Sequence, residues 1–371
     1  DFCSLMLSVR HDARSISDIA KETISEKAKI IFLSFVWLAL ILVIAVFVYI
    51  CAKTFVTQKE IIVPSLGLIP LAILVGFLMY NLKQNQILVT ILGLVGLVYL
   101  IYLGDIFPID IGPWALNIWI AVLLIYAFIA SVTPVHILLQ PRDYLSAFLL
   151  FAGMLFGFIG IFISHPKVIF PAYIGWNAPE EGLLWPALFV TVACGAISGF
   201  HSLISSGTSS KQLDNEKDAK KIGYGAMLAE GLVATIVVLV VAAAFSDKAS
   251  LSSTISAQGK GPVAAFGQAY GQFVSPFMGK FGTVFAILIV NTFVLTTLDT
   301  ATRICRYITN ELFRVKNRYL ATFVVVALSG WLGLSGEWNQ IWPIFGASNQ
   351  LVGALALIVI TSWLLSKRKW I

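Results

Sequence analysis

One segment near the middle of the chain concentrates side chains suited to binding a small polar solute. Between Val192 and Lys211 the sequence holds three glycines, one histidine and six serines, within an otherwise apolar run. Polar and ionisable groups inside a membrane segment are costly and usually functional. We therefore predict that a helix breaks here and lines a water-filled cavity, because broken helices expose backbone groups to a substrate.

On a helix, residues three, four and seven apart share one face. The predicted substrate-binding residues are Gly195, Ser198, Gly199, His201, Ser202 and Ser205. Phe200 and Ile204 are expected to point away from that face. The alternative is a contact between helices through small residues, with serine hydroxyls bonded back to the carbonyl one turn earlier.

A second polar group follows near the end of a later apolar run. Thr296, Thr297, Asp299 and Thr300 bring hydroxyls and a carboxylate to one helix. Oxygen ligands suit Na⁺, and Asp299 could instead carry a proton. An ordinary ion pair between Asp299 and Arg303, four residues apart on the helix, explains the same residues equally well.

Two further acidic residues have a structural and a functional interpretation each. Glu230 lies in the sequence Met227–Gly231, inside an apolar run, where it could relay protons or cap a neighbouring helix. The stretch 140–143 contains a proline and predicts a tight turn, with Asp143 as the N-cap of the next helix. The predicted ion-coupling residues are Asp299, Thr296, Thr297, Thr300 and Glu230.

The composition of the chain indicates which class of protein holds these residues. Of 371 residues, 58% are hydrophobic and 12% are charged, whereas soluble domains carry about 25% charged residues. A soluble enzyme and a disordered chain are therefore excluded, and four widely separated cysteines exclude a disulfide scaffold. The net charge of +6 forms no basic stripe with interleaved aromatics, so nucleic acid is not an expected partner.

The apolar runs predict an all-α polytopic membrane protein embedded in a lipid bilayer. A hydrocarbon core about 30 Å thick needs roughly 20 apolar residues per helix. Alternation typical of a β-barrel is absent. The ten predicted transmembrane helices are Ile30–Cys51, Ile62–Tyr80, Ile87–Gly104, Ala115–Leu139, Tyr144–Ser164, Leu184–Ser206, Tyr224–Phe245, Phe281–Thr302, Tyr319–Ser335 and Ile341–Leu365.

The distribution of basic residues between these helices predicts their orientation. With ten spans, loops on one side hold 19 of the 25 Lys and Arg residues and loops on the other side hold 6. The richer side is expected to be cytoplasmic. This predicts a cytoplasmic segment 1–29, a transmembrane domain 30–365 and a cytoplasmic tail 366–371, with both ends inside.

Motifs for catalysis or nucleotide binding are absent from the sequence. No Walker A motif, dinucleotide fingerprint, HExxH, CxxC or EF-hand loop occurs, so we expect no enzyme activity, catalytic residue, cofactor or metal. Gly195–Gly199 is similar to the GxSG of intramembrane serine proteases. Ala196 stands at the first glycine position, and His201 is on the same helix as Ser198 rather than facing it.

Ordered blocks along nearly the whole chain make it resemble the carbon starvation protein A family of peptide and pyruvate transporters. The resemblance implies a secondary transporter of the bacterial inner membrane that imports pyruvate or short peptides during carbon starvation, coupled to H⁺ or Na⁺. The blocks are 8–22, 140–149, 193–208, 222–228, 295–303 and 342–351.

The same resemblance implies an inverted-repeat fold of the amino acid–polyamine–organocation type, with a site between broken helices. By that analogy Gly195–Thr208 is one broken helix and Thr296–Thr300 lies near a cation site. Because the match begins at Asp1, we expect this chain to be truncated and to lack the partner broken helix.

Two other functions stay open on the sequence. A passive channel, or a membrane-embedded sensor of the solute, would use the same polar lining. An intramembrane protease is the weakest alternative. Pyruvate and peptides are not distinguished, since His201 and the serines fit either.

Overall fold

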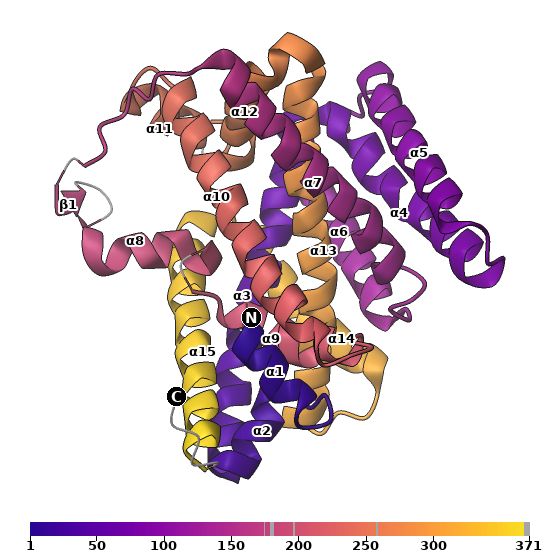
Figure 1. Cartoon of the computed structure of the whole chain (residues 1–371), viewed down its shortest axis with the longest axis vertical. Helices are drawn as coiled ribbons and strands as arrows, with labels where there is room; N and C mark the ends of the chain where they lie inside the picture. Colours follow the sequence, from indigo (N-terminus) through magenta and orange to yellow (C-terminus); the bar gives the residue numbers. More distant parts are fainter. Residues whose placement is uncertain (174, 179–181, 196, 257–258, 367–371) are drawn as a thin grey trace.

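The computed structural model describes residues 1–173, 175–178, 182–195, 197–256 and 259–366 as an assembly of helices (Figure 1). Eight helices in this part of the chain are long and apolar enough to cross a bilayer. This confirms the all-α polytopic architecture and gives eight candidate spans among the described residues, where ten were predicted. These spans are Glu26–Thr57, Lys59–Asn81, Gln86–Ile106, Ala115–Val132, Leu139–Ser164, Lys220–Ala244, Phe281–Leu312 and Gln340–Ser366.

The first missing span is the predicted helix Leu184–Ser206. The structure divides it into α8 (Leu184–Val192), a 3₁₀ turn (Ala193–Gly195) and α9 (Gly199–Gly207). α8 and the short pair β1 (Asn177–Ala178) and β2 (Gly182–Leu183) extend away from the helical bundle (Figure 1). A break therefore occurs where the glycines predicted it.

The other predicted span outside these eight is Tyr319–Ser335, which is present as a helix within one residue of its predicted bounds. It forms as α14 (Arg318–Leu334), which has 17 residues. At 1.5 Å per residue α14 is about 26 Å long, which is at the lower limit of about 17 residues for a helix that crosses a bilayer core. Asn317 caps its start through two backbone N–H groups, and Gly336 with φ +74° follows its end.

Two 32-residue helices form the centre of the bundle: α3 (Glu26–Thr57) and α13 (Phe281–Leu312). They pack against each other and against α6 (Ala115–Val132) and α14. α15 (Trp338–Ser366) lies along α3 on the other side. α4 (Ile62–Gly76) and α5 (Gln86–Ile106) form an outer pair (Figure 1).

The remaining helices pack on α13 and on one another. α7 (Leu139–Ser164) and α12 (Pro262–Met278) both pack on α13. α10 (Gly225–Ala244) continues a π-helical turn, Lys220–Tyr224, and α11 (Lys248–Ile255) follows it. Large apolar side chains are exposed on the outer faces of α5, α7 and α10, as expected of helices that a bilayer solvates.

The predicted cytoplasmic segment 1–29 is folded. It forms α1 (Phe2–Val9), α2 (Ile16–Thr23) and the first turn of α3. Leu5, Leu7 and Ile19 are buried. Of the predicted tail 366–371, all but Ser366 lies outside the described residues.

The predicted turn at 140–143 is wrong. α7 begins at Leu139, so Asp143 lies inside the helix and does not cap it. Pro141 is tolerated because it occupies the first turn, where backbone N–H groups have no partner within the helix. The chain turns earlier, after Thr133 and Pro134, where α6 ends.

Candidate functional site

A cavity of ≈ 330 Å³ opens between α1, α9, α10, α13 and the first turn of α7. Asp1, Asp143, Glu230 and His201 contribute its titratable side chains, and no Lys or Arg is among the described residues that line it. The cavity is therefore rich in negative charge. Its other lining residues are Leu5, Phe200, Ile204, Ser205, Ser209, Ile222, Gly223, Ala226, Thr296, Thr297 and Thr300.

α9 is held at its N-terminus by α15. The side-chain oxygen of Asn349 accepts the Phe200 N–H at 2.8 Å, and Ser198 caps α9 by accepting the His201 N–H at 3.0 Å. A Cβ atom on Gly199 would lie 2.2 Å from the Asn349 carbonyl oxygen. Only glycine permits this approach, so Gly199, the first residue of α9, docks this helix on α15.

The other end of α9 is held by α1. The hydroxyls of Ser4 and Ser205 lie 2.6 Å apart, and Ser8 donates to the Ser206 carbonyl at 3.0 Å. The Ile16 N–H donates to the Ser206 hydroxyl at 3.3 Å. Part of the predicted cytoplasmic segment 1–29 therefore contributes to the cavity wall through Asp1 and Leu5.

Only two of the six predicted substrate-binding residues line the cavity, namely His201 and Ser205. Ser198 caps α9, Ser202 is buried and donates to the Gly199 carbonyl at 2.6 Å, and Gly199 faces α15. Gly195, in the turn before α9, is not among the lining residues.

The cavity-facing side of α9 is rotated from the predicted one. Phe200 and Ile204, expected to point away, line the cavity instead. The reason is packing, since the small residues of α9 allow the close approach of α1 and α15. The back-bonded serines of the alternative interpretation occur at Ser202, Ser205 and Ser206.

His201 lies between two carboxylates from other helices. Its Nδ1 atom is 3.4 Å from an Asp1 oxygen and 3.5 Å from a Glu230 oxygen. Glu230 is within α10 and caps no helix end in the described structure. The side chains of Asp1, His201 and Glu230 are 19%, 32% and 40% exposed, so all three remain accessible from the cavity.

The predicted coupling residues on α13 fall into two groups. Thr296, Thr297 and Thr300 line the cavity. Asp299 is fully buried on another face of α13 and does not line it. The four residues therefore do not form one cation site.

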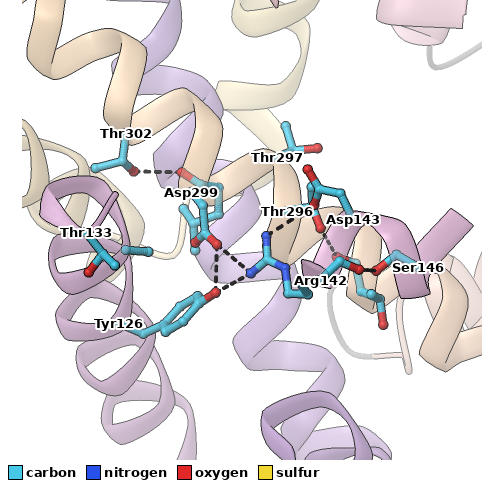
Figure 2. A network of polar contacts seen from close by, with 12 residues as sticks. Tyr126, Thr133, Arg142, Asp143, Ser146, Thr296, Thr297, Asp299 and Thr302 are labelled. Carbon is cyan, nitrogen blue, oxygen red and sulfur yellow. Dashed lines mark hydrogen bonds and ion pairs between the residues drawn. The ribbon is translucent and has the colours of Figure 1, made fainter. Parts of the chain in front are cut away.

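Figure 2 shows that Asp299 belongs to a buried polar network. It forms an ion pair with Arg142 of α7 and accepts the Tyr126 hydroxyl of α6 at 2.6 Å. Arg142 also donates to the Tyr126 oxygen. The side chains of Arg142 and Asp299 are 1% and 0% exposed, so neither charge meets water.

The predicted intrahelical pair between Asp299 and Arg303 is wrong. Arg303 donates to the backbone carbonyls of Ala130 and Thr133, each at 2.6 Å. These are orphan carbonyls at the C-terminal end of α6, where a cation is favoured. The partner of Asp299 comes from a residue 157 positions earlier in the chain.

Three residues of this region had no functional role in the sequence prediction: Tyr126, Arg142 and Asp143. Asp143 follows Arg142 but points toward Thr296 and Thr297 (Figure 2), and its side chain is 44% exposed. One oxygen lies 3.8 Å from an Arg142 nitrogen. An arginine within an apolar helix requires a partner. With the start of α7 placed at Leu139, the position of Arg142 inside the helix would have indicated a buried polar network here.

The chain matches the family model described as carbon starvation protein CstA over residues 1–260 and 243–371. The chain belongs to this family. The blocks on which the CstA resemblance depended converge in the structure. They supply His201, Asp143, Thr296 and Ile222 to the cavity wall, and Asn349 to the contact that holds α9.

Curated relatives of the CstA family are similar along the whole chain. The peptide transporter CstA of Campylobacter jejuni is 29% identical over 100% of this chain and 63% of its own length. The peptide transporter CstA of Escherichia coli is 30% identical, with 97% and 62% covered. The pyruvate/proton symporter BtsT of Escherichia coli is 30% identical, with 100% and 64% covered. The chain thus spans less than two thirds of these relatives.

Proposed function

We propose that the protein is a secondary active transporter that imports small carboxylates or short peptides together with protons. The observation that carries this proposal is the acid-lined cavity beside a broken helix. Names of relatives support it, since they include peptide transporters and a pyruvate/proton symporter. Import across the bacterial inner membrane during carbon starvation is part of the proposal.

The charge of the cavity supplies a reason for coupling. Asp1, Asp143 and Glu230 face it and no Lys or Arg lines it, so an anionic substrate meets like charge. Protonation of one carboxylate removes its repulsion of the anionic substrate. For two charges about 8–16 Å apart and an effective dielectric constant near 20, that repulsion is about 1–2 kcal/mol. Binding of a carboxylate substrate is then favoured by binding of a proton, and linkage makes the effect mutual.

We propose different roles for the acidic residues. Asp143 and Glu230 take up the coupling proton, with His201 beside Glu230 as a second acceptor. Asp299, with Arg142 and Tyr126, positions the first turn of α7 and thereby Asp143. Na⁺ at Thr296, Thr297 and Thr300 is the alternative coupling mode.

The same lining suits the amino end of a peptide. An ammonium group would pair with Glu230 or Asp143, and apolar side chains would contact Phe200 and Ile204. Pyruvate has no amine and must rely on proton uptake or backbone donors. The substrate-binding set of the proposal is His201 and Ser205 in the wall, with Ser198, Ser202, Gly195 and Gly199 shaping α9.

The proposed architecture is the inverted-repeat type of the amino acid–polyamine–organocation transporters. The broken pair α8 and α9 supports it, because such transporters bind substrate at discontinuous helices. The proposed topology has residues 1–29 and 366–371 in the cytoplasm and residues 30–365 as the transmembrane domain.

Uptake by the full-length protein in proteoliposomes tests the function. Labelled pyruvate and a labelled dipeptide are measured with a pH gradient, with a Na⁺ gradient and with neither. We expect saturable, uphill uptake driven by the pH gradient. Uptake indifferent to both gradients rejects coupling, and non-saturating downhill flux identifies a channel. Binding without any flux identifies a sensor.

A further inference from the structure

We propose that Asp1, His201 and Glu230 form a binding site for a divalent transition-metal ion of the Zn²⁺ type in the cavity wall. The three residues come from α1, α9 and α10 and are far apart in the sequence, so no sequence motif identifies the site. Their ligand atoms all lie within 4.8 Å of one another. This site goes beyond the proposed transport function and shares His201 and Glu230 with it, so a bound ion would occupy these two groups and leave Asp143 to take up the coupling proton.

The two distances from the ring nitrogen of His201 fit a metal better than they fit hydrogen bonds. The Nδ1 atom of His201 is 3.4 Å from Asp1 and 3.5 Å from Glu230. Both distances exceed an ordinary N–H···O bond of 2.7–3.2 Å. A tetrahedral ion with bonds of 2.0–2.2 Å separates its ligand atoms by about 3.3–3.6 Å.

The number of acceptors also points to a cation. Two carboxylates converge on a single ring nitrogen, and that nitrogen carries at most one proton. It can therefore donate to only one of them. A metal ion at the centre of the group satisfies the nitrogen and both carboxylates at once.

The ligand types select the class of ion. Mg²⁺ and Ca²⁺ take oxygen ligands almost exclusively, whereas an imidazole nitrogen with carboxylates suits Zn²⁺ and its neighbours. Three protein ligands leave a fourth position, which faces the cavity in the manner of an open zinc site. A bound ion would also place a positive charge where the described lining has no Lys or Arg.

Occupation of the site would join three helices. Asp1 belongs to the start of α1, His201 to the first turn of α9 and Glu230 to α10. A metal bridge between them resists their separation. We therefore expect Zn²⁺ to raise the thermal stability of the protein.

Zinc binding to the purified full-length protein in detergent tests the site without any transport measurement. Competition with a chromogenic chelator is expected to reveal one high-affinity Zn²⁺ per chain, unaffected by excess Mg²⁺. His201→Gln, Glu230→Gln and Asp1→Asn should each weaken binding by more than about tenfold, because loss of outer partners alone costs 10–100-fold. X-ray absorption at the zinc edge should show nitrogen and oxygen ligands at about 2.0–2.2 Å.

Two variants separate loss of the site from loss of the fold. Glu230→His keeps a metal ligand at this position and should retain high-affinity binding. His165→Gln, at an exposed histidine after α7, should bind as the wild type does. Equal zinc affinity in the wild type and in all three ligand variants, or a zinc shell that contains sulfur, would overturn the proposal.

Discussion

Two groups of polar side chains that contain carboxylates lie near each other in the molecule and differ in how their charges are compensated. Around Asp299 the carboxylate is sealed with Arg142 and Tyr126, and nothing in that trio lines the cavity. Around His201 the carboxylates of Asp1 and Glu230 remain partly exposed, with no Lys or Arg among the described lining residues. The sealed cluster is suited to holding helices in place, and the open one to exchanging protons, solutes or ions.

The largest effect is expected when the sealed cluster is broken. Arg142→Met leaves Asp299 buried without its ion-pair partner, and removal of one partner from a buried pair costs about 3–5 kcal/mol. Thermal unfolding in detergent measures the loss. Arg142→Met combined with Asp299→Leu should recover most of the stability, because no charge then stays buried. A single variant as stable as the wild type contradicts the structural role of the pair.

Asp143 connects the two clusters, because it follows Arg142 but faces the cavity. Asp143→Asn imitates the protonated carboxylate. The coupling free energy between proton binding and pyruvate binding should therefore fall by about 1–2 kcal/mol. Uptake with and without a pH gradient, compared in proteoliposomes, should differ less than in the wild type. Stability should change little because Arg142 keeps Asp299. Retention of the full gradient dependence would remove Asp143 from the coupling mechanism.

Glu230 distinguishes the two substrate classes in the open cluster. Glu230→Gln removes a partner for the amine of a peptide, and a partly exposed ion pair contributes up to about 1 kcal/mol. Dipeptide affinity should fall by up to about fivefold while pyruvate affinity holds or rises. Competition of each unlabelled solute with a labelled one measures the ratio. A parallel fall for both solutes assigns Glu230 a structural role.

The smallest expected effect concerns the seam between α1 and α9. Ser205→Ala removes the 2.6 Å contact between the Ser4 and Ser205 hydroxyls, and such a neutral bond contributes about 1 kcal/mol. A modest decrease in unfolding temperature is expected for Ser205→Ala. Ser4→Ala and the double variant should lower the unfolding temperature by no more than Ser205→Ala does. Additive losses would show that the two hydroxyls do not act as a pair.

Hydropathy placed nine of the ten expected spans on helices of the structure. It failed for Leu184–Ser206, where apolar content is high but the backbone breaks. Tyr319–Ser335 forms one residue earlier than predicted, as an apolar helix of 17 residues. Periodicity also predicted a different side of α9 to face the cavity, because several of its small residues serve the approach of α1 and α15 instead. The proline at position 141 suggested a turn, although a first helical turn accepts proline equally well.

The sequence by itself determined that the chain is a helical membrane protein of the CstA family, since hydropathy and ordered blocks need no knowledge of neighbours. It also identified His201, Glu230 and Asp299 as costly groups that require an explanation. Only the tertiary structure decided their partners: Asp1 and Glu230 for His201, and Arg142 with Tyr126 for Asp299. Electrostatic pairing acts over a few ångströms in space, and the residues concerned are separated along the chain by up to 200 positions, so local pattern carries no record of it.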